Sequence, residues 1–215
     1  LFLILAQIQA NHPAAQDILL KAFHRLDRLN YRFNVSLEQS GKKKKKKNFQ
    51  VSIHWPDEGD ILRETRVTPI QTKKKKPSSF WNRHFRNGSK PAKWMTLPIT
   101  GNLRDMSNKK SKKKKFSFAE LELTEKEILA HDHSLLDEEK LNDSPVYVIE
   151  SLEKGKNGKV KETKKLWIDQ NDFFIHKADF YTKSGRLYRS VECSYIQSFD
   201  GISFPELILV QDLKS

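Results

Sequence analysis

This sequence of 215 residues is poor in the residues that staple or anchor a small protein. Cys193 is its only cysteine, so the chain can form neither an internal disulfide nor a zinc site built on several cysteines. Only 8 glycines and 8 prolines are present, which excludes a collagen-like chain. No apolar run reaches the roughly 18 residues that a membrane-spanning helix needs.

Motifs of common catalytic sites are missing as well. The sequence contains no Gly-x-Ser-x-Gly elbow, no Gly-x-Gly-x-x-Gly and no P-loop. Glu138 and Glu139 are adjacent, so their carboxylates point apart and form no acid/base pair. His131 and His133 share a strand face but lack a third fixed ligand, which favours polar residues on an edge strand or loop over a metal site. We therefore expect no enzyme activity, no catalytic residue, no metal and no cofactor.

Positive charge is abundant but unevenly placed. There are 40 Lys+Arg against 27 Asp+Glu, a net charge of +13, yet three lysine runs hold 14 of these lysines and the rest of the chain carries about −1. The runs lie at predicted turns and contain no aromatic residue, whereas single-stranded nucleic-acid sites combine basic side chains with stacking aromatics. We expect solvated loop tips, with contact to an anionic membrane surface as an alternative and nucleic acid as a less favoured one. The candidate contact residues are the ends of the runs, Lys42 and Lys47, Lys73 and Lys76, and Lys112 and Lys115.

The first ten residues resemble the end of a secretory signal peptide. The apolar run Leu1–Leu5 precedes Ala6–Ala10, after which the chain becomes polar. A first helical turn or a buried strand is the alternative. We expect residues 1–10 to be a signal-peptide remnant, residues 11–215 to form one domain, and the protein to be exported and soluble.

Hydrophobic periodicity predicts one long helix followed by strands. Pro13–Leu29 carries Ile18, Leu19, Ala22, Phe23 and Leu26 on a single stripe, as in an amphipathic helix. Ser117 and Glu120 fit a capping box, which predicts a short helix over Ser117–Leu121. Between frequent turn signals lie strand-like runs: Tyr31–Leu37, Val51–Trp55, Ile61–Ile70, Phe80–Phe85, Lys93–Ile99, Val146–Leu152, Lys164–Asp169, Phe173–Tyr181, Leu187–Gln197 and Ile202–Val210.

These runs predict a mainly β (α+β) domain, in which sequential hairpins build one large curved antiparallel sheet. Such a sheet must bury its apolar face, and the predicted helices are too few to cover it. The sheet should therefore curl around an apolar hollow that suits an apolar ligand. A filled, dry core is the alternative, and periodicity alone does not decide between them.

Several segments resemble, in order and spacing, landmarks of the outer-membrane lipoprotein-sorting proteins, the LolA-like family. The first are Phe80-Trp81, the Trp-x-x-Leu-Pro segment Trp94–Pro98 and the aromatic-Ser-aromatic segment Phe116–Leu121. The C-terminal third continues the series with Pro145–Glu150, Leu166–Asp169, Ala178–Tyr181, Ser184–Leu187, Asp200–Ile202 and Pro205. The resemblance spans roughly residues 14 to 213.

The resemblance implies an unclosed antiparallel half-barrel with a helical lid, acting in the periplasm as a non-catalytic carrier of acyl chains. The implied partners are lipoproteins or other acylated lipids, an inner-membrane ABC-type releasing complex and an outer-membrane acceptor. The carrier would act as a monomer. In the best-known carriers an early-strand arginine is associated with lid opening, and Arg63 and Arg66 both lie in the comparable region. The implied cavity residues are Phe23 and Leu26 on the lid, and Phe33, Val35, Leu37, Val51, Ile53, Trp55 and Trp94 on the strands. The alternative function is a polyanion- or membrane-surface-binding protein with a filled core, acting through the lysine runs.

Overall fold

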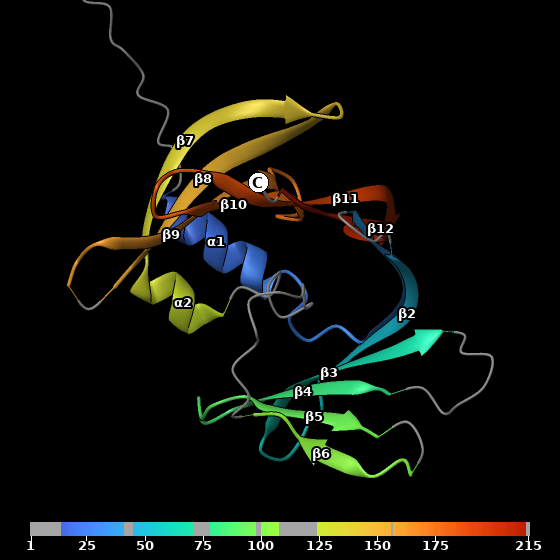
Figure 1. Cartoon of the computed structure of the whole chain (residues 1–215). Helices are drawn as coiled ribbons and strands as arrows, with labels where there is room; N and C mark the ends of the chain where they lie inside the picture. Colours follow the sequence, from blue (N-terminus) through green and yellow to red (C-terminus); the bar gives the residue numbers. More distant parts are fainter. Residues whose placement is uncertain are drawn as a thin grey trace, which may run out of the picture.

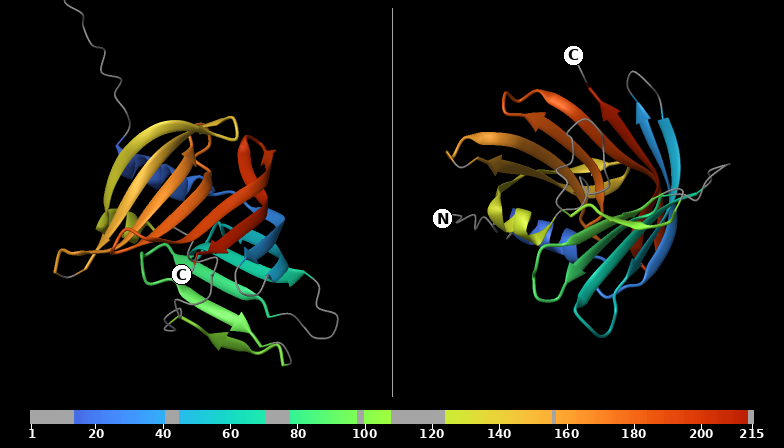
Figure 2. Two further views of the ribbon diagram at one scale, coloured as in Figure 1. Left: turned by 45° about the horizontal axis from the view of Figure 1, so that its top comes forward. Right: turned by 60° about the horizontal axis from the view of Figure 1, so that its bottom comes forward.

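The computed structural model describes residues 14–40, 45–70, 78–97, 100–107, 124–155 and 157–213. These residues form one 12-stranded sheet with the strand order β6-β5-β4-β3-β2-β1-β12-β11-β10-β9-β8-β7. The sheet curls without closing, and two helices lie on its concave side (Figures 1 and 2). The expected fold class, a mainly β unclosed half-barrel with helices, is confirmed.

Each half of the chain builds one arm of the sheet from sequential antiparallel hairpins. The N-terminal arm contains β1 (Tyr31–Ser40), β2 (Lys45–His54), β3 (Ile61–Ile70), β4 (Phe80–Phe85), β5 (Ala92–Thr96) and β6 (Leu103–Asp105). The C-terminal arm contains β7 (Asp132–Leu141), β8 (Ser144–Lys154), β9 (Val160–Asp169), β10 (Ile175–Thr182), β11 (Leu187–Phe199) and β12 (Ile202–Asp212).

The two arms join through the first and last strands. β1 pairs with β12 in parallel, from Ser36 opposite Leu207 to Ser40 opposite Gln211. The predicted hairpins are all antiparallel, so this junction is the one departure from the expected pairing among the described strands. It brings residues from the two ends of the chain together, which local turn signals cannot indicate.

Asn142-Asp143 and Asp200-Gly201, two of the turn signals between the strand-like runs, form tight turns between strands. Asn142 and Asp143 connect β7 to β8 with φ values of 50° and 67°, and Asp200 and Gly201 connect β11 to β12 with φ values of 51° and 77°. Positive φ at both central residues defines the type I′ turn, whose twist matches that of the flanking strands.

The first helix is shorter than its sequence pattern predicts. α1 (Ala15–His24) buries Ala15, Ile18, Leu19 and Ala22, so the apolar stripe is confirmed. The predicted end at Leu29 is wrong, because Arg28 adopts a φ of 63°, a left-handed conformation that cannot continue a helix. Leu26 therefore packs against the core from the turn that follows α1.

The second helix, α2 (Glu125–Ala130), begins at a capping box. The hydroxyl of Thr124 accepts the backbone N–H of Glu127 at 3.2 Å, and the Glu127 carboxylate accepts the backbone N–H of Thr124 at 3.2 Å. The capping box predicted at Ser117 and Glu120 lies outside the described residues. Neither described helix has the length and apolar character that crossing a membrane would require.

Part of the first lysine run is strand and not turn. Lys45–Lys47 begin β2 and pair with the end of β1, and Lys46 Nζ lies 2.6 Å from Glu38 Oε1. The turn prediction is wrong for these three residues, because the backbone ladder between β1 and β2 extends beyond their apolar portions. The remaining candidate contact lysines and the signal-peptide segment lie outside the described residues: Lys42, Lys73–Lys76, Lys112–Lys115 and residues 1–10.

Candidate functional site

The concave face of the sheet is apolar and packs around α1, which lies between the two arms (Figure 2). At the centre, Ile18 and Leu19 of α1 and Ile128 of α2 are at most 1% exposed. Alternate residues along each strand share this face. The buried strand residues are Val35, Phe49, Val51, Ile53 and Val67 from the N-terminal arm, and Ile149, Leu166, Ile168, Ala178, Phe180, Val191, Ile208 and Val210 from the C-terminal arm.

Eight of the nine residues expected to line a cavity lie at this contact between helix and sheet. Val35, Val51 and Ile53 belong to the buried core, and the other five are partly buried against it: Phe23, Leu26, Phe33, Leu37 and Trp55. Because α1 occupies the hollow, these side chains contact protein in the structure. Their role in binding a ligand stays a prediction.

Trp94 and Arg66 lie on the outer face of the sheet. Trp94 of β5 is opposite Trp81 of β4, and Trp81 is opposite Arg66, the neighbour of the inward-facing Val67. The Arg66 guanidinium carbon lies 5.1 Å from the centre of the Trp81 ring. Of the two arginines that the resemblance left open, only Arg63 therefore faces α1.

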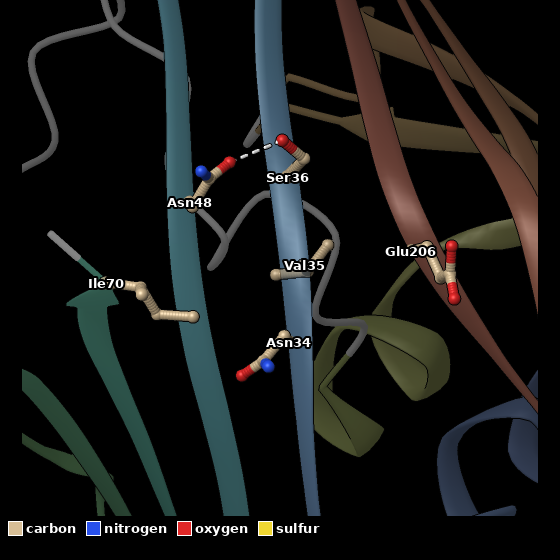
Figure 3. Close-up of a pocket in the computed structure, with 6 residues that line it drawn as sticks. All are labelled: Asn34, Val35, Ser36, Asn48, Ile70 and Glu206. Atoms are coloured by element: carbon tan, nitrogen blue, oxygen red, sulfur yellow. Dashed lines mark hydrogen bonds between the residues drawn. The ribbon is translucent and has the colours of Figure 1, made fainter.

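Two shallow depressions lie at the surface of the sheet. One, of about 350 Å³, is lined by Asn34, Val35, Ser36, Asn48, Ile70 and Glu206, close to the start of the parallel pairing between β1 and β12 (Figure 3). Four of its six lining residues are polar, and the Ser36 hydroxyl donates to Asn48 Oδ1 at 2.6 Å. The other, of about 360 Å³, lies at a bulge in β7 and is lined by residues 135–138. Neither is lined by a residue of α1, so neither is the apolar hollow that the sequence predicts.

A buried polar group, the Arg63 cluster, lies beside the end of α1 and consists of Arg63, Trp55, Asn82 and His84. Arg63 of β3 is 9% exposed, and its guanidinium carbon is 5.7 Å from the ring centres of both Phe23 and Trp55. Its Nη2 donates to Nε2 of His84 at 3.2 Å, and Asn82 Nδ2 lies 3.1 Å from the same nitrogen.

His84 is neutral in this cluster. Its Nε2 faces two donors and must therefore be the unprotonated nitrogen, with the ring proton on Nδ1. Burial, helped by the positive charges of Arg63 and Lys93, lowers the pKa of His84 from 6.5 to about 4.

A buried ion pair holds the turn that follows α1. Arg25 Nη2 lies 3.3 Å from Asp172 Oδ2, and the two side chains are 12% and 11% exposed. Burial opposes ionisation of Asp172, but the backbone N–H groups of Ser203 and Phe174 and the charge of Arg25 outweigh it, so its pKa lies below the usual value. Arg25 also donates to the carbonyl of Ser203. We call Arg25, Asp172 and Ser203 the Arg25 latch. It joins the end of α1 to the β9–β10 turn and to the start of β12.

Sequence reasoning missed the partners of these arginines. The alternation in Phe80–Phe85 places Asn82 and His84 on one face, but only the register of β4 against β3 shows that His84 lies opposite Arg63.

Among the described residues no group of three potential ligands is placed to hold a metal ion, and His133 Nε2 lies 2.7 Å from the backbone carbonyl of Ile128.

Solved structures with the same architecture define the class of fold. An outer membrane lipoprotein-sorting protein domain from Vibrio parahaemolyticus aligns with a TM-score of 0.65 at 16% identity, over 92% of this chain and 85% of that one. A DUF1329 family protein from Desulfovibrio piger gives 0.65 at 19% identity over 89% and 82%. A LolA superfamily protein from Nitrosomonas europaea gives 0.55 at 20% identity over 94% and 88%. The described chain thus has the fold of the LolA superfamily, as the sequence resemblance indicated.

A protein-family model described as "Uncharacterized protein" matches residues 64–215, and the chain belongs to that family. No curated protein matches the sequence.

Proposed function

We propose that this protein is a non-catalytic periplasmic carrier that binds the acyl chains of lipoproteins, or of a related lipid, between α1 and the concave face of the sheet. The main support is the continuous apolar surface that both arms present to α1. In this proposal, eight of the nine cavity residues expected from the sequence, all but Trp94, contact the acyl chains once α1 has moved aside. The partners would be an inner-membrane ABC-type releasing complex and an outer-membrane acceptor, and residues 11–215 would act as one exported domain.

The energies are compatible with reversible binding. Burial of an acyl chain contributes about 0.8 kcal/mol per CH₂ group, so one chain of ordinary length can offset the displacement of a short helix. α1 has only 10 residues and buries four of them. Its apolar contacts are of the same kind as those that an acyl chain would make with the same surface, so an acyl chain can replace them.

Lipid bound to the purified protein gives the direct test. Mass spectrometry of the organic extract should find acylated species in about one-to-one amounts with the protein. A protein that carries no lipid after purification, and that takes up none from added lipoprotein or phospholipid, would contradict the proposal.

Movement of α1 can be tested separately by cross-linking. Lys21 Nζ lies 5.1 Å from the centre of the Phe173 ring, so Lys21→Cys with Phe173→Cys places two thiols across the gap between helix and sheet. Cys193 is partly buried, and burial raises its pKa to about 12, so the native thiol is a poor competitor for a short bismaleimide. The cross-linked protein should lose lipid exchange, and reagent-treated Lys21→Cys alone should retain it. Undiminished exchange in the cross-linked protein would show that α1 is not the lid.

The second candidate function is binding of a polyanion or an anionic membrane surface. The observations that favour it are the packed concave face and the exposed Lys45–Lys47 at the start of β2. It predicts retention on heparin at high salt by a protein that contains no lipid.

A further inference from the structure

The Arg63 cluster contains hydrogen-bond donors that have no acceptor among the described residues. Within the described part of the chain, Arg63 Nε and Trp55 Nε1 are buried and have no hydrogen-bond partner. The only hydrogen bond that the Arg63 guanidinium makes there is to neutral His84. A buried donor without an acceptor costs about 1–3 kcal/mol and more when it is charged, so native proteins keep such groups sparingly.

The charges that act on His84, the hydrogen-bond partner of Arg63, from the described residues are positive. The other charged group that acts on His84 is Lys93, which lies opposite Asn82 on β5. Glu64, the acidic neighbour of Arg63 in the sequence, alternates to the outer face and forms an ion pair with Arg83 there. None of the carboxylates in the described residues forms an ion pair with Arg63, in contrast to Arg25 and Arg189, which pair with Asp172 and Asp212.

We propose that the Arg63 cluster is an oxyanion site that takes the phosphate-type headgroup of an anionic acyl lipid, with Arg63 Nε and Trp55 Nε1 as its donors. The inference rests on the proposed carrier function, since the acyl chain would lie in the hollow that the cluster borders. The guanidinium is the side chain best matched to phosphate and carboxylate oxygens, because it is always charged and offers several donors in one plane.

The position of the cluster fits a ligand that enters when α1 moves. Arg63 is covered by Phe23, the partly buried aromatic residue near the end of α1. Displacement of this ring exposes the guanidinium at the same moment as the apolar face next to it. A lipid with a negative headgroup would then replace the weak cation–π contact with charge-assisted hydrogen bonds while its chain replaces the apolar contacts of α1.

The experiment compares two lipids that differ only in the anion. Lysophosphatidic acid and the monoacylglycerol with the same acyl chain are titrated into the full chain, and inorganic phosphate alone is a third ligand. The variants are Arg63→Met, which keeps the bulk of the side chain, Arg63→Lys, which keeps the charge, and Arg66→Met as a matched control on the outer face of the same strand. Calorimetry gives the dissociation constants, and thermal melting shows that each variant folds.

The natural chain should bind lysophosphatidic acid about 10- to 100-fold more tightly than monoacylglycerol, the range expected for hydrogen bonds to a charged group. Arg63→Met should abolish this preference by lowering the affinity for lysophosphatidic acid to that for monoacylglycerol, whereas Arg63→Lys should retain part of the preference and Arg66→Met all of it. Arg63→Met should melt no lower than the natural chain, because it removes a buried charge that has no counter-ion.

The other outcomes separate the headgroup site from the carrier. Equal binding of both lipids by the natural chain, or an equal loss for both lipids in Arg63→Met, overturns the oxyanion site and leaves the carrier in place. Binding of neither lipid overturns the carrier and with it the headgroup claim. Phosphate binding that disappears in Arg63→Met would in that case support a site for a free oxyanion, and its absence would overturn that site too.

Discussion

At the scale of single residues, three described arginines that are largely removed from water, Arg25, Arg63 and Arg189, differ in how their charge is balanced. Arg189 Nε donates to Asp212 Oδ1 at 2.8 Å, and Arg25 is paired with Asp172. Arg63, which is equally removed from water, contacts two aromatic rings and a neutral histidine. Buried charges are usually paired, so the Arg63 cluster is a place where the described chain gives up stability.

The pH dependence of the free energy of unfolding reports on the Arg63 cluster through His84. The pKa of His84 is about 4 in the folded protein and near 6.5 when the chain is unfolded, so the unfolded state binds more protons between these values. The contribution of His84 to the free energy of unfolding is therefore complete above pH 6.5 and is lost as the pH is lowered towards 4. We expect urea unfolding of the natural chain to show a loss of about 1 kcal/mol between pH 7 and pH 5, after discounting for the partial exposure of the ring.

His84→Gln should remove this part of the pH dependence, because glutamine keeps an acceptor for Arg63 but does not titrate. His54→Gln, on an exposed histidine of β2, serves as the control and should keep the slope of the natural chain. Identical slopes in all three proteins would show that His84 does not couple folding to pH.

At the scale of elements, alternation in the sequence predicted the strands that have one apolar face. β3 and β4 begin and end where the pattern places them, at Ile61–Ile70 and Phe80–Phe85. β7 is absent from the predicted strand-like runs, although His133 is expected on an edge strand or loop, because the second half of β7 is acidic and it forms one edge of the sheet, where few side chains need burial. β6, with three exposed residues, carries no pattern that could be recognised.

The candidate site was predicted only in part, because it depends on register and on side-chain reach. The apolar residues of α1, β1 and β2 follow from periodicity, and eight of nine do meet at one surface. The resemblance implies that Trp94 lies at that surface, but β5 turns it outward, since a five-residue strand does not show from sequence which face is buried. The contacts of Arg25 with Asp172 and of Arg63 with His84 join separate segments, and no local signal marks them.

The Arg25 latch should control both the stability of the fold and the mobility of α1. Arg25→Ala removes the cation beside Asp172, whose carboxylate keeps the backbone N–H groups of Phe174 and Ser203, so we expect a loss of about 1–3 kcal/mol in the free energy of unfolding, below the cost of breaking a fully buried pair. Because the pair joins the turn after α1 to the sheet, the variant should also exchange bound lipid faster. Denaturant unfolding and the release rate of a fluorescent fatty acid measure the two effects.

Arg32→Ala is the matched control, since Arg32 is exposed on β1 only a few residues further along the chain. Its free energy of unfolding should change by less than about 0.5 kcal/mol and its release rate should stay that of the natural chain. An Arg25→Ala variant as stable as this control would contradict the view that the latch fixes α1.

At the scale of the whole molecule, two arms of similar construction meet at a single parallel junction and enclose α1 from both sides (Figure 2). The inner surface is apolar across that junction, because Val35 of β1 and Ile208 and Val210 of β12 are all buried in one cluster. The net charge of +13 comes from the lysine runs, and the described residues 45–47 of the first run are exposed at the end of β2. Charge and apolar surface are thus separate features, and they can be removed independently.

Replacement of all 14 run lysines by serine should separate the two candidate functions. The variant carries a net charge of about −1, so it should leave a heparin column at low salt, whereas the natural chain is retained by counter-ion release that scales with the number of lysine contacts. Its lipid affinity and melting temperature should match those of the natural chain, because the one described pair that it removes, Lys46 with Glu38, is solvent-exposed and such pairs contribute less than about 1 kcal/mol. Loss of lipid binding together with heparin binding would mean that the lysine runs hold the ligand and that the apolar surface is only a core.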